Sequence, residues 1–208
     1  MKKLFLVDIC GTLYRENTTF LFLDNFLGSS DKCITRKNIT LKIINKIMLV
    51  LFRFDLIKFY SLKRLKGINQ ETLYVEAAKI CRSKLTENIG IHKFIDLKKQ
   101  DGYDIVLVSA TIDPVASYIS SSLGIRCISS QLKYDNDKCL GVLEDDIFFT
   151  KHKKVSDLLL KYDLVEMITD NKTDLPLCQK CNRFYGVSYS KKDAHFWSEN
   201  GAYKVYEL

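Results

Sequence analysis

The sequence predicts an α/β protein: a parallel sheet with helices on both faces and a helical segment inserted after the first strand. Two observations support this fold class. Short apolar runs alternate with helical patterns along most of the chain, and connections this short favour parallel strands joined by crossover helices. One long stretch near the N-terminus interrupts the alternation and has helical patterns throughout.

Short apolar runs that end in polar or small residues predict the strands. The first run, residues 4–7, leads directly into Asp8 and a Gly-Thr turn. Four more runs follow the helical stretch, at residues 105–108, 126–129, 165–168 and 185–189. In open α/β sheets, ligands bind beyond the carboxyl ends of the strands. The residues that follow these runs are therefore the first candidates for a functional site.

Helical patterns fill the gaps between the later strands and predict the layers that cover the sheet. They span residues 114–123, 153–162, 175–181 and 194–200. Gly124 and Gly201 stand where C-terminal caps are expected.

The stretch that breaks the alternation predicts a helical insertion. Apolar residues recur there at three- and four-residue spacing, as from Leu41 to Leu51, and Gly67 punctuates the pattern. At 208 residues the chain has room for one α/β domain and this insertion. We predict a core of residues 1–13 and 97–208 and an insertion of residues 14–96. The sequence indicates no oligomeric state.

The positive charge of the chain is concentrated in the insertion. Residues 14–96 contain 15 Lys and Arg against 8 Asp and Glu, whereas the rest is balanced at 17 against 17. Either a solvated helical surface or an anionic partner explains this excess. Nucleic acid is not the expected partner, because the aromatic residues of the segment lie among aliphatic ones at helical spacing, which is typical of a core. They are Phe20, Phe22, Phe52, Phe54, Phe59 and Tyr60.

Residues 39–62 are the most apolar part of the insertion. A membrane-spanning helix needs about 20 predominantly apolar residues, and here charged residues interrupt the run, so we predict no transmembrane span. They are Lys42, Lys46, Arg53, Asp55 and Lys58. Packing within the insertion is the favoured interpretation, and weak association of a basic amphipathic helix with an anionic membrane surface is the alternative.

The seven cysteines are an odd number, and no secretory signal precedes the first strand. This predicts free thiols in a reducing cytoplasm. Cys178-x-x-Cys181 is a lone pair on a predicted helix, so we interpret it as thiols packed against the sheet.

Four polar segments at predicted strand ends and helix starts form the candidate site. Each taken alone is explained by a turn, a cap or a solvated residue, but their joint occurrence in one order favours a site. Hydrolysis of a phosphate ester needs a nucleophile, cations and hydroxyls for the phosphoryl oxygens, and a proton for the leaving group. Carboxylates on neighbouring strands suit Mg²⁺. The segments are Asp8-Ile9-Cys10-Gly11-Thr12, Ser109-Ala110-Thr111, Lys151-His152-Lys153-Lys154 and the pair Asp170 and Asp174.

These segments resemble the motifs of the haloacid dehalogenase superfamily, in its phosphoserine-phosphatase-like branch. Residues 61–67 are similar to the cap of that branch, and residues 138–141 to its approach to the lysine motif. The resemblance implies a Rossmann-like core, a helical cap and an aspartyl-phosphate on Asp8. It implies phosphoryl contacts from Gly11, Thr12, Ser109, Ala110 and Lys154, with Lys151 and Lys153 as competitors for the lysine role. It also implies Mg²⁺ held by Asp8, the Cys10 main-chain carbonyl, Asp170 and Asp174.

Cys10 departs from the family motif, Asp-x-Asp-Gly-Thr, at the position of the acid-base aspartate. A thiol has a reference pKa of about 8.5 against about 3.9 for aspartate, so it is a poor substitute. We predict a cytoplasmic, Mg²⁺-dependent phosphatase of small phosphorylated substrates with slow turnover. Arg15, Arg64 and Lys66 are further candidate contacts for the substrate. The alternatives are a phosphotransferase, a phosphate-binding protein without turnover, or a protein that interacts with a membrane surface.

Overall fold

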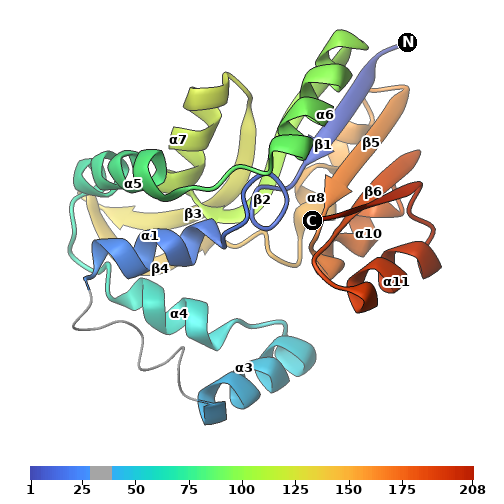
Figure 1. Cartoon of the computed structure of the whole chain (residues 1–208). Helices are drawn as coiled ribbons and strands as arrows, with labels where there is room; N and C mark the ends of the chain where they lie inside the picture. The colour runs from blue at the N-terminus through green and yellow to red at the C-terminus, as the bar shows by residue number, and fades with distance from the viewer. Residues whose placement is uncertain (29–38) are drawn as a thin grey trace.

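The structure is a computed structural model, and it describes residues 1–28 and 39–208. Seven strands form one sheet in the order β4-β3-β2-β1-β5-β6-β7 (Figure 1). All neighbouring pairs are parallel except β3 and β4. The strands are β1 (Lys3–Val7), β2 (Tyr103–Ile112), β3 (Cys127–Asp135), β4 (Lys138–Asp145), β5 (Leu164–Thr169), β6 (Arg183–Ser188) and β7 (Lys204–Glu207).

The five strands predicted from apolar runs are confirmed as β1, β2, β3, β5 and β6. The sequence reasoning missed β4 and β7. β4 pairs with β3 through a tight turn in which Asn136 and Asp137 both have positive φ, 46° and 61°. An Asn-Asp pair is suited to such a hairpin turn, so the sequence does contain a signal for the β3–β4 hairpin. β7 is a four-residue edge strand without an apolar run.

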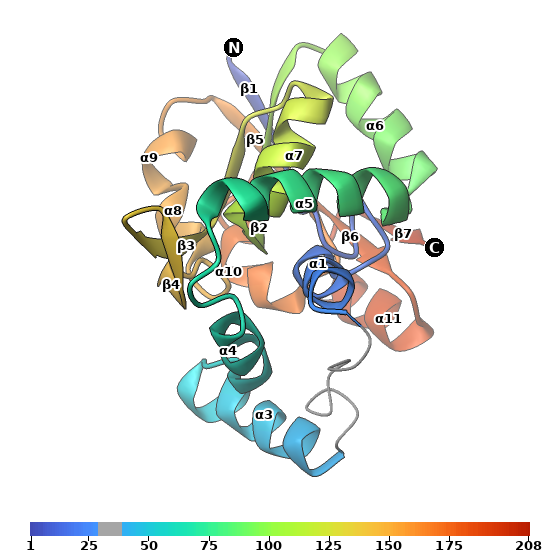
Figure 2. The same ribbon diagram turned by 90° about the vertical axis from the view of Figure 1, so that its left-hand side faces the viewer.

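Helices occupy both faces of the sheet and one end of the molecule (Figures 1 and 2). Each predicted helix of the C-terminal half is present with shifted bounds, and the one predicted at 153–162 is two short helices that begin at Lys151. The helices are α1 (Thr18–Phe26), α3 (Ile39–Phe52), α4 (Leu56–Lys63), α5 (Gln70–Lys84), α6 (Ile89–Gln100), α7 (Asp113–Leu123), α8 (Lys151–Lys154), α9 (Ser156–Leu159), α10 (Leu175–Cys178) and α11 (Lys191–Glu199).

The alternating side chains of the strands divide the core into two layers. Phe5 and Val7 belong to one buried cluster, and Leu4 and Leu6 belong to the other. Because successive strand residues point to opposite faces, both faces of the sheet are buried. This confirms the predicted fold class and explains why the first strand is a continuous apolar run.

The helices of residues 14–96 occupy different places in the fold. α5 packs on α7, and α6 packs on β2 and contributes Ile91 and Ile95 to the core. α4 lies beside β4, and α3 packs on α4 away from the central strands (Figure 2). The division into a core and an insertion at residues 14 and 96 therefore stays a prediction.

The packing of α3 in the structure differs from the packing that the sequence favours. The sequence predicts that its apolar residues pack within the insertion, but the structure leaves most of them exposed and buries Asn45. The Asn45 side chain accepts a hydrogen bond from the Ile57 main-chain amide of α4 at 3.0 Å, and Leu41, Met48 and Leu49 are half-buried. Among residues 1–28 and 39–208, no helix combines the length and the apolar character that a bilayer crossing requires.

The described cysteines are free thiols. Cys178 is buried and Cys181 packs beside it in the core, in agreement with the predicted packing of this pair on the sheet. Cys33 lies outside the described residues.

Candidate active site

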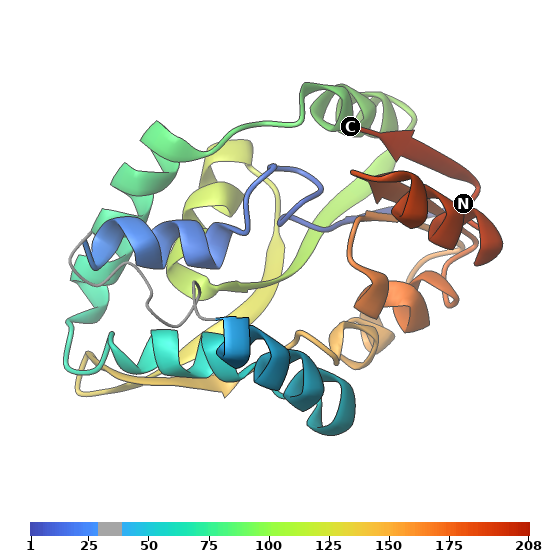
Figure 3. The same cartoon turned by 60° about the horizontal axis from the view of Figure 1, so that its bottom comes forward.

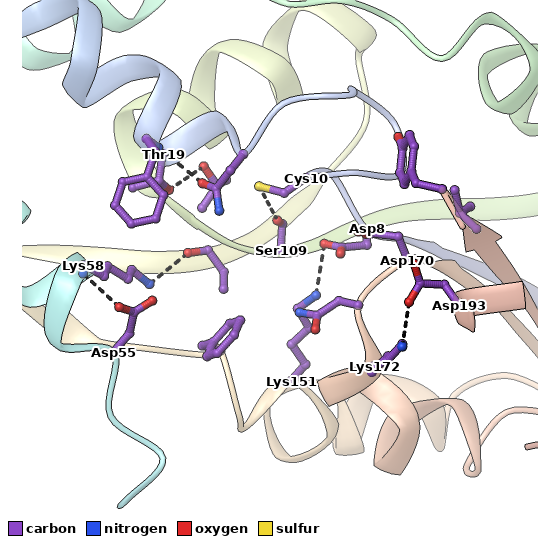
Figure 4. A pocket seen from close by; sticks show the side chains of 18 residues that line it. Asp8, Cys10, Thr19, Asp55, Lys58, Ser109, Lys151, Asp170, Lys172 and Asp193 are labelled. Carbon is purple, nitrogen blue, oxygen red and sulfur yellow. Dashed lines mark hydrogen bonds and ion pairs between the residues drawn. The ribbon is translucent and has the colours of Figure 1, made fainter. Parts of the chain in front are cut away.

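The carboxyl ends of three adjacent strands bring the predicted segments together. β1 lies between β2 and β5, with Val7 opposite Leu107 and Ile168, so Asp8, Ser109 and Asp170 follow at one edge of the sheet. They line a cavity of about 560 Å³ (Figure 4). Cys10, Ala110 and Lys151 line the same cavity.

Asp8 is buried and is held on two sides. Its Oδ1 accepts hydrogen bonds from the Ile9 main-chain amide at 2.8 Å and from Lys151 Nζ at 3.0 Å. Lys151 also donates to Asp174 Oδ2 at 2.7 Å, and the Thr169 hydroxyl donates to the same oxygen at 2.8 Å. Burial alone would lower the pKa of Lys151, but the charges of Asp174 and Asp8 outweigh it and raise that pKa. Lys151 is therefore a fixed positive charge beside Asp8.

Of the three lysines in the predicted basic run, Lys151 lies beside Asp8. Lys154 pairs with Asp145, is largely exposed and is not part of the cavity wall, and Lys153 is exposed too. α8 begins at Lys151, so its inward side carries Lys151 and Val155, four residues apart. The resemblance favours Lys154 with Lys151 and Lys153 as competitors, and the structure places Lys151 beside Asp8.

Gly11 and Thr12 position Asp170 and are not among the residues that line the cavity. Gly11 has a φ of 70°, and a Cβ there would lie 2.2 Å from Asp170 Oδ2, so only glycine fits. The Thr12 hydroxyl donates to Asp170 Oδ1 at 3.0 Å and accepts from the Asp170 amide at 2.8 Å. The Tyr189 hydroxyl donates to the Gly11 carbonyl at 2.8 Å and braces the same turn. Gly11 and Thr12 thus support Asp170 in the structure, and their predicted phosphoryl contacts stay a prediction.

The acidic side chains at this edge carry more negative charge than the neighbouring lysine offsets. Burial and then the charge of Asp8 raise the pKa of Asp170. Burial also raises the pKa of Asp174, although Lys151 opposes the shift. Asp174 Oδ1 is buried with no hydrogen-bond partner among the described residues. Both observations are what a missing positive charge would produce.

These residues fit a hard divalent cation. Within residues 1–28 and 39–208, no three His, Cys, Asp or Glu side chains form a group that could hold a metal ion. A cation here would instead rely on the carboxylates of Asp8 and Asp170, the main-chain carbonyl of Cys10 and water. Few protein oxygens and several waters suit Mg²⁺. Asp174, which accepts a hydrogen bond from Lys151, would support these ligands without being one of them.

Replacing Asp170 with asparagine is expected to stabilise the metal-free protein. An amide keeps an oxygen for the Thr12 hydrogen bond and removes a crowded negative charge. Because Asp170 is partly exposed, we expect a gain in the free energy of unfolding of only about 1–2 kcal/mol near pH 8. Urea unfolding with a chelator measures it.

The stability difference between Asp170→Asn and the native chain is expected to depend on pH. The pKa of Asp170 is higher in the folded than in the unfolded chain, so native stability falls as pH rises through that interval. The advantage of Asp170→Asn should be full above the folded pKa and vanish below about pH 3, where the unfolded carboxyl, with a pKa of about 3.9, is also protonated. The exposed Asp157→Asn is the matched control and should change nothing. Equal stability of Asp170→Asn and the native chain near pH 8 would contradict the charge crowding.

Cys10 faces the cavity as a neutral thiol. Burial raises its pKa, and the negative charge of Asp8 raises it further. Its Sγ lies 3.1 Å from the Thr18 hydroxyl. It lies 3.8 Å from the Ser109 hydroxyl (Figure 4). Thr18 in turn hydrogen-bonds to Thr111 at 2.7 Å. The place two residues after Asp8 therefore holds a group that neither gives up nor takes a proton readily near neutral pH.

The far wall of the cavity contains residues that sequence reasoning missed. Lys58 is buried, and its Nζ donates to the Ala110 carbonyl at 3.1 Å and to Asp146 at 3.0 Å. Lys172 lines the cavity at another side, where it pairs with Asp193 at 2.6 Å. No sequence signal singles out either lysine, because their place depends on how α4 and the β5 end meet the core.

The three basic residues predicted as substrate contacts lie elsewhere. Arg15, Arg64 and Lys66 are exposed and are not among the residues that line the cavity. The Arg15 side chain donates to Asn88 instead, at 3.2 Å. They sit on turns that face solvent, and among the residues that the structure describes, the lysines that line the cavity are Lys58, Lys151 and Lys172.

An α/β sheet that gathers a strand-end aspartate, further carboxylates and a buried lysine at its carboxyl edge has the parts of a phosphoryl-transfer site. Residues 5–179 match the family of haloacid dehalogenase-like hydrolases. The chain belongs to this family. No protein with a curated description matches the sequence.

Solved structures show the same fold over the whole chain. A phosphoserine phosphatase determined as a phospho-aspartyl intermediate analogue is 18% identical, with a TM-score of 0.72, and the match covers 100% of this chain and 94% of the other. A protein of unknown function from Bordetella pertussis Tohama I is 17% identical, with a TM-score of 0.74 and coverage of 100% and 99%. A phosphoserine phosphohydrolase-like protein from Francisella tularensis is 19% identical, with a TM-score of 0.64 and coverage of 99% and 94%. The chain therefore has a phosphoserine-phosphatase-like fold.

Proposed function

We propose that this chain is a slow, Mg²⁺-dependent phosphatase of small phosphomonoesters that acts through a phosphorylated Asp8. The observation that carries the proposal is the setting of Asp8. It is a buried carboxylate on the cavity wall, at the end of the central strand, and Lys151 and the Ile9 amide orient it. Membership of the haloacid dehalogenase-like hydrolases supports the same chemistry.

In the first step an Asp8 oxygen attacks phosphorus, a bond to Asp8 forms, and the ester P–O bond breaks with its electron pair on the leaving oxygen. Lys151 and the Ser109 hydroxyl, which share the cavity wall with Asp8, hold the phosphoryl oxygens. Magnesium bound by Asp8, Asp170 and the Cys10 carbonyl would neutralise negative charge on those oxygens. In the second step water attacks phosphorus, gives up a proton, and releases phosphate and free Asp8.

Cys10 slows both chemical steps, but not to the same extent. The leaving oxygen of an alkyl phosphate needs a proton, and the attacking water must lose one. A neutral thiol with a raised pKa is a weak acid and a poor base for these tasks. General acid-base assistance is typically worth about 10²–10⁴ in rate. An aryl phosphate has a good leaving group and needs little help in the first step, so with it the second step becomes the slow one.

Rapid mixing with an aryl phosphate and Mg²⁺ should therefore give a burst of phenol close to one per protein molecule, followed by slow turnover. Intact-protein mass spectrometry of the quenched burst should show one added phosphoryl group, located on Asp8 by peptide mapping. Asp8→Asn should show neither the burst nor the added group. Chelation of Mg²⁺ should remove both from the native chain. Turnover by Asp8→Asn at the native rate would overturn the proposal.

A further inference from the structure

α3 exposes an apolar surface at the periphery of the molecule. Its inward side carries Asn45, which binds the Ile57 amide of α4. Its outward side carries apolar residues three or four positions apart, and we call these the α3 face: Ile39, Ile43, Ile44, Ile47, Val50 and Leu51, which are 43–73% exposed. Figures 1 and 3 show α3 beside α4 at the periphery of the molecule. Leu41, Met48 and Leu49 of the same helix are half-buried, but most of its apolar residues are exposed, whereas an amphipathic helix of a water-soluble domain usually buries them.

Positive charge borders the α3 face. Lys42 and Lys46 are exposed on the same helix, one turn apart, and Arg53 is exposed immediately after its end. α3 contains no acidic residue. All of the charge excess of the chain lies in the surrounding segment, where residues 14–96 contain 15 Lys and Arg against 8 Asp and Glu.

We propose that the α3 face docks on the surface of a membrane that contains anionic lipids. The helix would lie in the plane of the interface, with Ile43, Ile47 and Val50 in the acyl boundary and Lys42 and Lys46 among the headgroup phosphates. It does not cross the bilayer, because 14 residues of helix measure about 21 Å against a hydrocarbon core of about 30 Å.

The charges distinguish a lipid surface from a second copy of the chain. If two α3 faces paired, the lysines of both copies would border one apolar contact with no acidic side chain on either helix to offset them. An anionic lipid surface supplies the opposite charge and also accepts the apolar side chains. The inference is independent of the proposed hydrolysis, because it uses none of the residues of the cavity.

Flotation of the full chain with lipid vesicles tests the proposal. With phosphatidylcholine vesicles that contain about 30% phosphatidylglycerol, the protein should float with the lipid, and pure phosphatidylcholine should retain much less. Salt of about 0.5 M should weaken the binding because it screens the lysines. Lys42→Gln with Lys46→Gln should weaken binding to the anionic vesicles about 25-fold, since each lysine near such a surface contributes about fivefold.

The apolar contribution has a matched control. Ile43→Ser, Ile47→Ser and Val50→Ser together should abolish flotation. Val75→Ser, Ile89→Ser and Leu160→Ser together change the same kinds of exposed residue on other helices and turns, and should float like the native chain. Circular dichroism checks that both triple variants are folded. The proposal is overturned if the native chain stays with the soluble fraction, if both triple variants float equally, or if sedimentation shows a lipid-independent dimer that the α3 substitutions dissociate.

Discussion

Replacing Cys10 with aspartate is expected to raise the steady-state rate of Mg²⁺-dependent aryl phosphate hydrolysis about 10²–10⁴-fold. The Cys10 side chain lies on the cavity wall with Asp8, so a carboxyl group there can reach the leaving oxygen and the attacking water. Burial and the charge of Asp8 raise the pKa of the thiol, and they would raise that of an aspartate too. A carboxyl with a pKa shifted toward neutrality is suited to giving and then taking a proton.

The measurement is kcat together with the burst. In Cys10→Asp the second step is no longer slow, so the burst should disappear as turnover rises. Cys10→Asn is the matched control, because its amide has the size of the aspartate and no acidic proton, and it should stay as slow as the native chain. Cys10→Asp combined with Asp8→Asn should be inactive. If Cys10→Asp is no faster than Cys10→Asn, the missing acid is not what limits this site.

Replacing Lys151 with glutamine is expected to lower kcat about 10²–10³-fold, whereas Lys154→Gln should stay within about twofold of the parent. Lys151 Nζ contacts Asp8 at 3.0 Å, while Lys154 pairs with Asp145 outside the cavity. The measurement is best made in the Cys10→Asp background, where a large loss is visible. The two variants carry the same substitution on one short helix, so a difference between them comes from the position of the lysine and not from the kind of substitution.

Lys151→Gln also leaves two buried carboxylates without their cation. We expect the free energy of unfolding to fall by about 3–5 kcal/mol in the metal-free protein. Activity should therefore be compared at a temperature where circular dichroism shows both variants folded, with saturating Mg²⁺. Equal losses in the two variants would contradict the assignment of Lys151. A loss confined to Lys154→Gln would restore the lysine that the sequence favoured.

Much of the site was predictable because it depends on strand order and local turns. Asp8, Ser109 and Asp170 each follow an apolar run, and parallel strands deliver such residues to one edge. The glycine at position 11 also carried information, because only that residue tolerates the approach of Asp170. These features depend on residues that are consecutive in the chain, so they can be recognised in a single sequence.

The differences between the predicted and the observed positions have a common physical origin. Lys151 and Lys154 lie in the same basic run, and the packing of α8 decides which of them lies beside Asp8. Lys58 was missed because a residue of α4 reaches the cavity only when that helix docks beside β4. Arg15, Arg64 and Lys66 were assigned to the substrate on charge alone, and their turns face solvent.

The sequence by itself determined five of the strands, the family and the chemical nature of the position two residues after Asp8, because these depend on residue identity and near neighbours. Only the tertiary structure decided which lysine lies beside Asp8, that Gly11 and Thr12 support Asp170, and that most apolar residues of α3 are exposed. Each of these depends on long-range contacts, such as the Asn45 hydrogen bond to Ile57 and the ion pair of Lys151 with Asp174. Local patterns do not encode such contacts, since many orientations of a helix share one periodicity.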